Sequence, residues 1–363
     1  MCSRVLLPIL EMCDIISLNL NVLWEDNMKL DFLQVKNSAL GAVRVTQEED
    51  GFHFYRFTQA QEALYKSRSE EFYMKSFGTS GVQLRFKTNS TKLFMKVCVS
   101  PGSSRRYFSF EVFANGVRVG TIDNFSSEVL PQDYTVVKLP LGEFSKEFEL
   151  GQGDKEIRVY FPWSAVAVVQ EITLDDGATI TPVKPKHKLL CFGDSITHGY
   201  DALYPSNKYI SRLADALDAE EFNKAIGGEI FFPELASTQE DFVPDYITVA
   251  YGTNDWSKCS EEELTANCRT FYSNLSQNYP NSKIFAITPI WRKDMTEDRK
   301  LGDFHKAEQI IRKTTERLEN VTVISGFEFV PQQEELFADL RLHPNDQGFA
   351  YYYRGLKACI ENT

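Results

Sequence analysis

Short runs of alternating hydrophobic and polar residues fill much of the N-terminal half of the chain. In the segment 82–88, with the sequence VQLRFKT, every second residue is hydrophobic, and the segment 92–99 repeats this pattern. Two more alternating runs, within 107–122, meet at Asn115-Gly116, a dipeptide typical of tight β-hairpin turns. Further short strands are expected at 134–139, 156–161 and 165–174. Because no stretch with a helical period interrupts these strands, the pattern predicts an antiparallel β-sandwich of the jelly-roll type.

The hydrophobic pattern changes after residue 188. The run LLCF at 189–192 is continuously apolar, as expected for a strand buried in a parallel sheet. An amphipathic helix is predicted from about Ser206, and another from Ser260, which can form a capping box with Glu263. Further strands are predicted near 221–226 and at 246–252, 283–290 and 321–326, and further helices at 304–319 and 345–360. Strands that alternate with helices predict a parallel sheet with helices on both faces.

Between these two regions lies the segment 182–188, which is rich in proline and lysine and has no hydrophobic period. We predict a linker there, with a β-sandwich domain at 28–181 before it and an α/β domain at 189–363 after it. Residues 1–27 form a leader whose status the sequence leaves open, since translation could also start at Met28. The leader lacks a cleavage pattern, and no stretch of 18 apolar residues exists to span a membrane, so we expect a cytoplasmic location.

The composition narrows the classes of partner. The formal net charge of −12 disfavours nucleic acid and anionic membranes, because both reward clustered lysine and arginine. The seven cysteines are scattered without a C-x-x-C motif, which is typical of buried thiols in a reducing compartment. No cluster of His, Cys and carboxylate residues has metal-ligand spacing, so we predict no metal and no other cofactor. A small molecule is the expected partner, and the sequence indicates no oligomeric state.

Four polar segments follow predicted strands of the second region or precede its last helix. They are GDSITHG at 193–199, GGE at 227–229, GTND at 252–255 and DLRLHPND at 339–346. Loops beyond the carboxyl ends of parallel strands gather at one edge of the sheet. Together these segments contain what acyl transfer requires, namely a nucleophile, a base and donors to an oxyanion.

Ser195 is the candidate nucleophile and His343 the candidate base. The backbone amides of Ser195 and Gly228 and the side-chain amide of Asn254 are candidate oxyanion donors, and a glycine lets the backbone approach closely. Each segment alone is an ordinary turn or helix start. Their joint occurrence, each beside a buried strand, favours a catalytic site.

Residues next to these candidates receive other interpretations. Asp194 and Asp255 are expected to stabilise their loops. Trp256 is a candidate pocket wall, the alternative being plain packing. His198 is a candidate pocket residue, the alternative being a residue at a helix start that faces solvent.

The four segments resemble the sequence blocks of the SGNH, or GDSL-like, hydrolases, over about residues 188–360. The resemblance implies that Ser195 is the nucleophile, that His343 is the general base, and that Ser195, Gly228 and Asn254 form the oxyanion hole. It also implies a three-layer α/β/α, flavodoxin-like fold with a five-stranded parallel sheet. The chain has no G-x-S-x-G motif, so it does not resemble the α/β-hydrolases.

One position departs from the pattern of this family. The family usually places an aspartate three residues before the histidine, where this chain has Leu340, and Asp339 is the nearest substitute. Either the loop holds one extra residue and Asp339 orients His343, or the site is a Ser-His dyad in which a backbone carbonyl holds the imidazole.

A β-sandwich ahead of such a domain is similar in architecture to two-domain carbohydrate esterases. This similarity implies a serine esterase that removes short acyl groups, acetyl above all, from a sugar through an acyl-enzyme. The alternatives are a lipid acylhydrolase or thioesterase, an acyltransferase, and a carbohydrate-binding protein that retains the fold without activity. A lipid enzyme should show an apolar stripe or lid, which is not evident, and a non-catalytic protein need not keep all the expected active-site residues.

Overall fold

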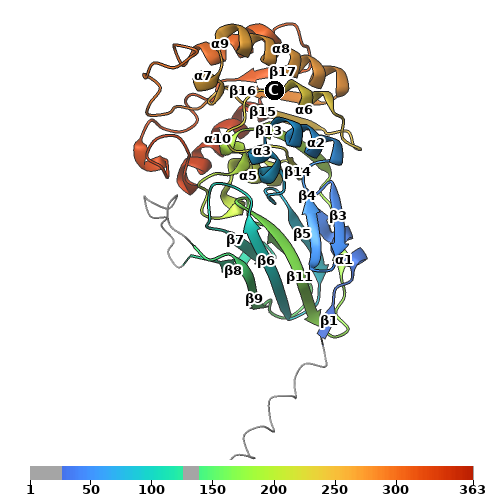
Figure 1. Ribbon diagram of the computed structural model, residues 1–363. Helices are drawn as coiled ribbons and strands as arrows, with labels where there is room; N and C mark the ends of the chain where they lie inside the picture. Colours follow the sequence, from blue (N-terminus) through green and yellow to red (C-terminus); the bar gives the residue numbers. More distant parts are fainter. Residues whose placement is uncertain (1–26, 126–138, 363) are drawn as a thin grey trace, which may run out of the picture.

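The computed structural model describes residues 27–125 and 139–362, which form a β-sandwich below an α/β region in Figure 1. The predicted leader lies outside the described residues except for Asn27, and so does nearly all of the strand expected at 134–139. Among the residues described, no helix is long and apolar enough to cross a membrane.

The sandwich consists of two sheets whose strand pairs are all antiparallel. The first has the order β3-β4-β11-β6-β9, with β1 paired to β11. Its strands are β1 (Asn27–Lys29), β3 (Arg44–Glu48), β4 (Gly51–Tyr55), β6 (Lys92–Pro101), β9 (Gly142–Glu149) and β11 (Ala165–Asp175). The second has the order β12-β5-β10-β7-β8, with β2 paired to β5. Its strands are β2 (Ala39–Leu40), β5 (Gln83–Thr88), β7 (Ser109–Ala114), β8 (Val117–Asp123), β10 (Lys155–Tyr160) and β12 (Thr181–Pro182).

The alternation in the sequence explains this architecture. The hydrophobic residues of β5 and β6, such as Phe86 and Met95, are buried in the core of the sandwich. Asn115 and Gly116 have φ values of 49° and 78°, as a type I′ turn requires, and they join β7 to β8. The predicted antiparallel sandwich is therefore confirmed.

The expectation that no helix interrupts the strands is wrong. Three helices do so, α1 (Phe32–Ser38), α2 (Gln59–Arg68) and α3 (Glu70–Ser76). They are short and largely polar, so their hydrophobic period is weak, and the decisive signal for α2 is the capping box of Thr58 and Gln61. Figure 1 shows α2 and α3 beside the α/β region, where the ring of Tyr65 packs 5.5 Å from that of Phe232.

The α/β region contains a five-stranded parallel sheet with the order β14-β13-β15-β16-β17. The strands are β13 (His187–Gly193), β14 (Ala219–Asn223), β15 (Tyr246–Ala250), β16 (Lys283–Ile287) and β17 (Val321–Ile324). The helices are α4 (Ser195–His198), α5 (Tyr209–Ala216), α6 (Pro233–Ser237), α7 (Asp255–Lys258), α8 (Glu261–Asn278), α9 (Lys306–Thr315) and α10 (Asp346–Glu361). Single 3₁₀ turns lie at Pro205–Asn207 and Glu334–Leu336.

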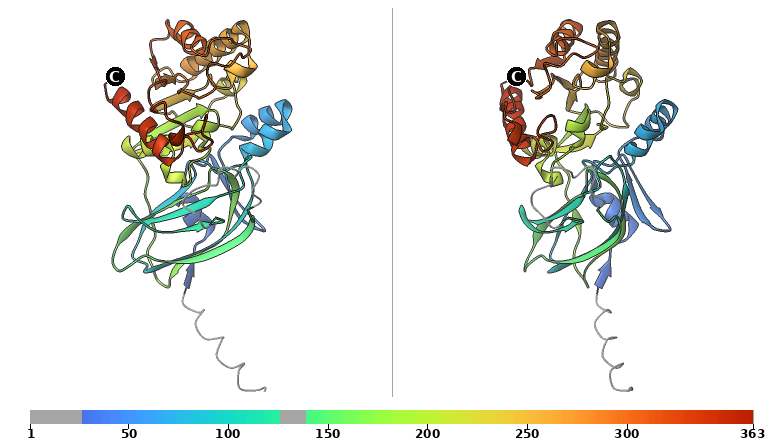
Figure 2. Two further views of the ribbon diagram at one scale, coloured as in Figure 1. Left: turned by 90° about the vertical axis from the view of Figure 1, so that its left-hand side faces the viewer. Right: turned by 60° about the vertical axis from the view of Figure 1, so that its left-hand side comes forward.

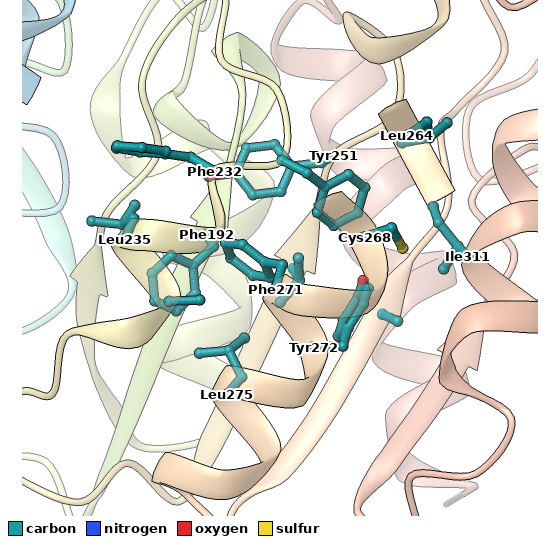
Figure 3. Close-up of a cluster of buried hydrophobic side chains, with 14 of the residues drawn as sticks. Phe192, Phe232, Leu235, Tyr251, Leu264, Cys268, Phe271, Tyr272, Leu275 and Ile311 are labelled. Atoms are coloured by element: carbon teal, nitrogen blue, oxygen red, sulfur yellow. The ribbon is translucent and has the colours of Figure 1, made fainter. Parts of the chain in front are cut away.

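Helices cover both faces of this sheet, as the periodicity predicts (Figure 2). Alternate residues of β13 face opposite cores: Phe192 packs with α6 and α8, whereas Cys191 lies in the core that holds α5 and α10. Figure 3 shows the first of these cores, in which Phe271 and Tyr272 of α8 lie close to Phe192 and Tyr251. The result is the predicted three-layer α/β/α fold with a five-stranded parallel sheet.

Both ends of the predicted linker belong to sheets. Pro182 is the last residue of β12, which pairs with β5, and β13 begins at His187, so the segment between the two strands is 183–186. The extension of β13 is stabilised by backbone hydrogen bonds, because the N–H of His187 donates to the carbonyl of Asp218 at 3.0 Å. The two sheet systems are thus joined by four residues.

Buried charged groups connect the sandwich side to the α/β sheet. The guanidinium of Arg56, which is 1% exposed, donates to the carbonyls of Gly78, Asn223 and Ala225. The Nζ atom of Lys208 donates to Ser80 Oγ and Glu221 Oε1, both at 2.9 Å. Since an unpaired buried charge is costly, these contacts hold the two regions in one arrangement.

Candidate active site

The candidate nucleophile lies where β13 ends. Ser195 is the first residue of the four-residue helix α4, and it is 5% exposed. The side chain of Asp194 caps this helix by accepting from the N–H of Ile196 at 2.9 Å, and Gly199, with a φ of 112°, ends it. This short turn holds the Ser195 Oγ atom 2.8 Å from Nε2 of His343.

The loop before α10 carries the candidate base and the candidate acid. Oδ1 of Asp339 accepts from the backbone N–H groups of Arg341, Leu342 and His343 at 2.7–3.0 Å. Its Oδ2 atom lies 2.8 Å from Nδ1 of His343. Leu340 has a φ of 55°, so the one extra residue is accommodated by a turn through the left-handed region. Of the two arrangements left open by the sequence, the geometry corresponds to the one with an extra residue in the loop.

These contacts determine the charge and the tautomer. Burial alone would raise the pKa of Asp339, but the hydrogen bond and charge of His343, with the backbone N–H groups, hold that pKa well below its usual range. An ionised Asp339 accepts the Nδ1 proton of His343, which leaves the lone pair of Nε2 facing the Ser195 hydroxyl. A histidine in this tautomer can remove a proton from the hydroxyl.

The candidate oxyanion donors lie on the loops after β14 and β15. Gly228 has a φ of 90°, a backbone conformation that residues with a side chain rarely adopt. The Asn254 Nδ2 atom donates to the carbonyl of Glu229 at 3.0 Å, so Asn254 and the Gly228 loop are adjacent. The ammonium of Lys258 donates to the carbonyl of Gly228 at 2.7 Å. The bond to Glu229 uses one of the two hydrogens of the Asn254 side-chain amide, which leaves the second for another acceptor.

Residues of the helices α2 and α3 support this loop from the sandwich side. The Nζ atom of Lys75 donates to the carbonyl of Gly227 at 3.0 Å, and Arg68 pairs with Glu229 at 2.5 Å. The ring of Phe72 lies near Gly228, since a Cβ built on Gly228 would lie 3.7 Å from it. The wall of the site beside the oxyanion loop therefore comes from a segment about 150 residues earlier in the chain.

His198 is not exposed to solvent. It is fully buried, its Nε2 atom lies 2.9 Å from the carbonyl of Trp163, and its Nδ1 atom accepts from the N–H of Gly227 at 3.3 Å. Burial and the nearby charge of Arg56 lower the pKa of His198 well below its usual value, so the ring is neutral. The expectation that this residue faces solvent is wrong, because the sandwich covers it.

Trp256 is also fully buried, which agrees with the packing alternative rather than with a pocket wall. Its Nε1 atom donates to the carbonyl of Gly302 at 2.6 Å, and its ring meets that of Phe304 edge-on at 5.1 Å. Asp255 holds its own loop by accepting from the N–H groups of Phe231 and Gly252 at 3.1 and 3.0 Å. Burial raises the pKa of Asp255 to about 7 and that of Asp194 to about 6.

Three further residues at the site were not found from the sequence. The ring of Tyr200 stacks on that of His343 at 5.7 Å, and Oδ2 of Asp201 lies 3.5 Å from Nδ1 of His343. Arg105, from the sandwich, pairs with Asp201. Tyr200 and Asp201 directly follow the Ser195 segment, so their position in the chain was a usable signal. Arg105 carries no such signal, since only the tertiary structure brings it here.

Among the described residues the structure also contains two carboxylate–histidine clusters, one from segments far apart in the chain and one within residues 48–53. Asp201, Asp339 and His343 have potential ligand atoms within 4.8 Å of one another, as do three residues on the sandwich, Glu48, Asp50 and His53. In the first cluster His343 Nδ1 is hydrogen-bonded to Asp339, and Asp201 is paired with Arg105. In this cluster the potential ligand atoms are therefore already engaged in hydrogen bonds and ion pairs.

Comparison with known proteins supports an assignment. Solved structures with a similar fold include a protein of Bacteroides ovatus named as a GDSL-like lipase, with a TM-score of 0.72 and 19% identity over 93% of this chain and 97% of that chain. The salicylyl-acyltransferase SsfX3 from a tetracycline biosynthetic pathway has a TM-score of 0.71 and 19% identity over 89% and 94% of the two chains. An acetyl xylan esterase from the rumen bacterium Butyrivibrio proteoclasticus has a TM-score of 0.59 and 15% identity over 93% and 97%. At these identities the likeness is one of fold.

The sequence comparisons are more specific. No curated protein matches the chain. Residues 191–351, which include all four candidate loops, match the model of the GDSL-like lipase/acylhydrolase family. The α/β region of this chain therefore contains a domain that matches the GDSL-like lipase/acylhydrolase family, which supports an enzyme that hydrolyses ester bonds.

Proposed function

We propose that this protein is a serine esterase that removes short acyl groups, acetyl above all, from carbohydrate. The observation that carries this proposal is the hydrogen-bonded series Ser195–His343–Asp339, with distances of 2.8 Å between successive members, at the carboxyl end of β13. A hydroxyl, an imidazole and a carboxylate in this order form the arrangement that activates a serine nucleophile.

In the proposed reaction, Ser195 Oγ attacks the ester carbonyl carbon while its proton passes to Nε2 of His343. The negative charge on the carbonyl oxygen is stabilised by the backbone N–H groups of Ser195 and Gly228 and by the Asn254 amide. The C–O bond to the leaving alcohol then breaks, and the alcohol takes the proton from His343. Water attacks the acyl-enzyme with the same proton transfers and releases the carboxylic acid and free Ser195.

The substrate class is supported by two observations. One structure with the same two-region fold is an acetyl xylan esterase. The surroundings of the site include several charged groups: Lys258 and Lys75 donate to carbonyls of the oxyanion loop, and Arg105 pairs with Asp201 beside His343, whereas a long acyl chain requires an apolar lining. These surroundings favour a small acyl group on a hydroxylated alcohol over a lipid.

The test compares hydrolysis of p-nitrophenyl acetate with that of longer p-nitrophenyl esters and of an acetylated xylan oligosaccharide. We expect the acetyl esters to be preferred, and we expect the Ser195→Ala variant to lose at least about 10³-fold in kcat. Equal rates for the wild type and the Ser195→Ala variant would refute the serine mechanism. A preference for acyl chains of eight carbons or more would refute the deacetylase assignment.

Acyl transfer to an acceptor other than water is a second candidate, because one of the similar structures is an acyltransferase. The two functions share the acyl-enzyme and differ in which molecule attacks it. Adding a sugar alcohol to the p-nitrophenyl acetate assay separates them. Transfer predicts an acetylated sugar and faster release of p-nitrophenol, whereas hydrolysis predicts acetate alone.

A further inference from the structure

Two carboxylates, not one, lie at Nδ1 of His343. Asp339 comes from the histidine's own loop, with Oδ2 at 2.8 Å. Asp201 comes from the loop after α4, with Oδ2 at 3.5 Å. The Asp201 side chain is completely buried, whereas that of Asp339 is 20% exposed. A buried carboxylate beside a second carboxylate must be stabilised by other groups, because burial and the like charge both destabilise its ionised form.

The sandwich supplies the cation that holds Asp201 in this position. Nε and Nη2 of Arg105 donate to the two oxygens of Asp201 at 2.7 and 3.0 Å, a bidentate pair. Tyr107, also on the sandwich, donates to Oδ1 at 3.4 Å. Asp201 itself has a φ of 71°, in the left-handed region, so its backbone is strained in the conformation that orients this side chain. Oδ2 is thereby directed at His343.

We propose that Asp201, clamped by Arg105 of the sandwich, is a second carboxylate for His343, a positioning residue that shares the Nδ1–H with Asp339. This inference rests on the proposed function, since it concerns the same histidine. When Asp339 is intact, Asp201 adds negative charge beside the imidazolium that forms as Ser195 loses its proton. When Asp339 is removed, Asp201 accepts the Nδ1–H and keeps the tautomer in which Nε2 is the base.

A double-mutant cycle tests the shared role. We expect Asp339→Asn to lower kcat by on the order of 10²-fold, less than the 10⁴-fold typical of a triad with one acid. Asp201→Asn should lower kcat only a few-fold in the wild type. In the Asp339→Asn background it should lower kcat by a further factor on the order of 10². If Asp201→Asn costs the same factor in both backgrounds, Asp201 has no part in orienting His343 and the inference fails.

The pH profile gives a readout that damage to the fold would not move. Among the described residues, the charged groups around His343 include Asp339 on its own loop, Asp201 after α4, and Arg105, which pairs with Asp201, while Asp194 after β13 interacts with the charge of His343. Asp201→Asn removes a negative charge, so the acid limb of kcat/KM should move to lower pH. Arg105→Met removes a positive charge beside Asp201 and His343, so the limb should move to higher pH. Shifts in the same direction, or none, would contradict the proposal, and Arg105→Met keeps it testable if Asp201→Asn does not fold.

The chain offers a matched control in Asp346. This half-buried carboxylate accepts from the N–H of Leu203 at 2.8 Å and from the side-chain amide of Asn207 at 2.7 Å, so it holds the loop that follows Asp201. Asp346→Asn should leave the acid limb and the cost of Asp339→Asn unchanged, and a shift like that of Asp201→Asn would mean that the loop, not the carboxylate, is responsible. Ser195→Ala separates the two proposals: full activity in that variant defeats the proposed function, whereas an additive cycle with an inactive Ser195→Ala defeats only this inference.

Discussion

At the residue scale, the informative position is Leu340. The sequence shows a leucine where an aspartate is usual, and it leaves open whether the site has an acid at all. In the structure, a φ of 55° at Leu340 turns the chain tightly enough for Asp339 Oδ2 to lie 2.8 Å from Nδ1 of His343. Three backbone N–H groups of the same turn also donate to the carboxyl of Asp339, and these hydrogen bonds stabilise its ionised form.

The oxyanion role of Asn254 is testable at this same scale. Asn254→Ala removes one donor to the developing charge, so kcat should fall by on the order of 10²–10³-fold while KM changes little, because the donor acts mainly in the transition state. Steady-state kinetics on p-nitrophenyl acetate checks this. Asn274→Ala is the control, since its amide also donates to a backbone carbonyl, that of Pro233 at 3.0 Å. A rise in KM with unchanged kcat would assign Asn254 to substrate binding instead.

At the scale of elements, the helices α2 and α3 are the unexpected part of the molecule. They interrupt the sandwich in sequence, yet they pack on the α/β core and hold the oxyanion loop through Lys75 and Arg68. A loop that carries an amide donor must be held within fractions of an ångström, because misplacement by about 1 Å can cost 10²-fold in rate.

We therefore expect Lys75→Met to act on kcat. Methionine keeps much of the side-chain volume but removes the donor to the Gly227 carbonyl, so kcat should fall about tenfold with KM within about twofold. Lys66→Met on α2 is the matched control, since the Lys66 ammonium lies over the ring of Tyr73. If Lys66→Met and Lys75→Met have equal effects, the helices matter only for general stability.

At the scale of the whole molecule, buried charged groups tie the sandwich to the α/β sheet and also shape the response to pH. Lys208 and Glu221 are paired at 2.9 Å with almost no exposure, and Ser80 of the sandwich side shares the ammonium. Such pairs resist separation, because breaking one leaves an uncompensated buried charge. The two regions are thus expected to unfold together.

The buried carboxyl of Asp255 predicts a definite pH dependence of stability. Its pKa is about 7 in the fold against an ordinary 3.8, so its contribution is fully present below about pH 4 and is lost as the pH rises towards 7. The free energy of unfolding of the wild type, relative to that of Asp255→Asn, should therefore fall by a few kcal/mol between pH 4.5 and pH 8.

Urea unfolding at a series of pH values measures this difference. Asp175 serves as the comparison: although burial raises its pKa, hydrogen bonds from Thr91 hold that pKa below the usual value, so the effect of Asp175→Asn should be constant above pH 4.5. A constant difference for Asp255→Asn as well would show that Asp255 does not titrate in this range.

The sequence by itself determined the features that depend on neighbours in the chain. Alternation predicted the antiparallel sandwich, continuous apolar runs between amphipathic stretches predicted the parallel sheet with helices on both faces, and Ser260 with Glu263 marked the start of α8. The four polar segments beside buried strands identified Ser195, Gly228, Asn254 and His343 as candidates. These inferences need only local periodicity and the rule that loops at one end of a parallel sheet converge.

Only the tertiary structure decided which groups meet across the two regions. His198 and Trp256 are buried because other parts of the chain cover them, which no local pattern records. The short helices α2 and α3 owe their stability to packing on the α/β core, and their amphipathic period is weak because they are short and largely polar. Arg105 reaches Asp201 from 96 residues away in sequence. Contacts of this kind depend on how two hydrophobic cores pack against each other. Local sequence patterns do not record that packing, because the residues in contact are far apart in the chain.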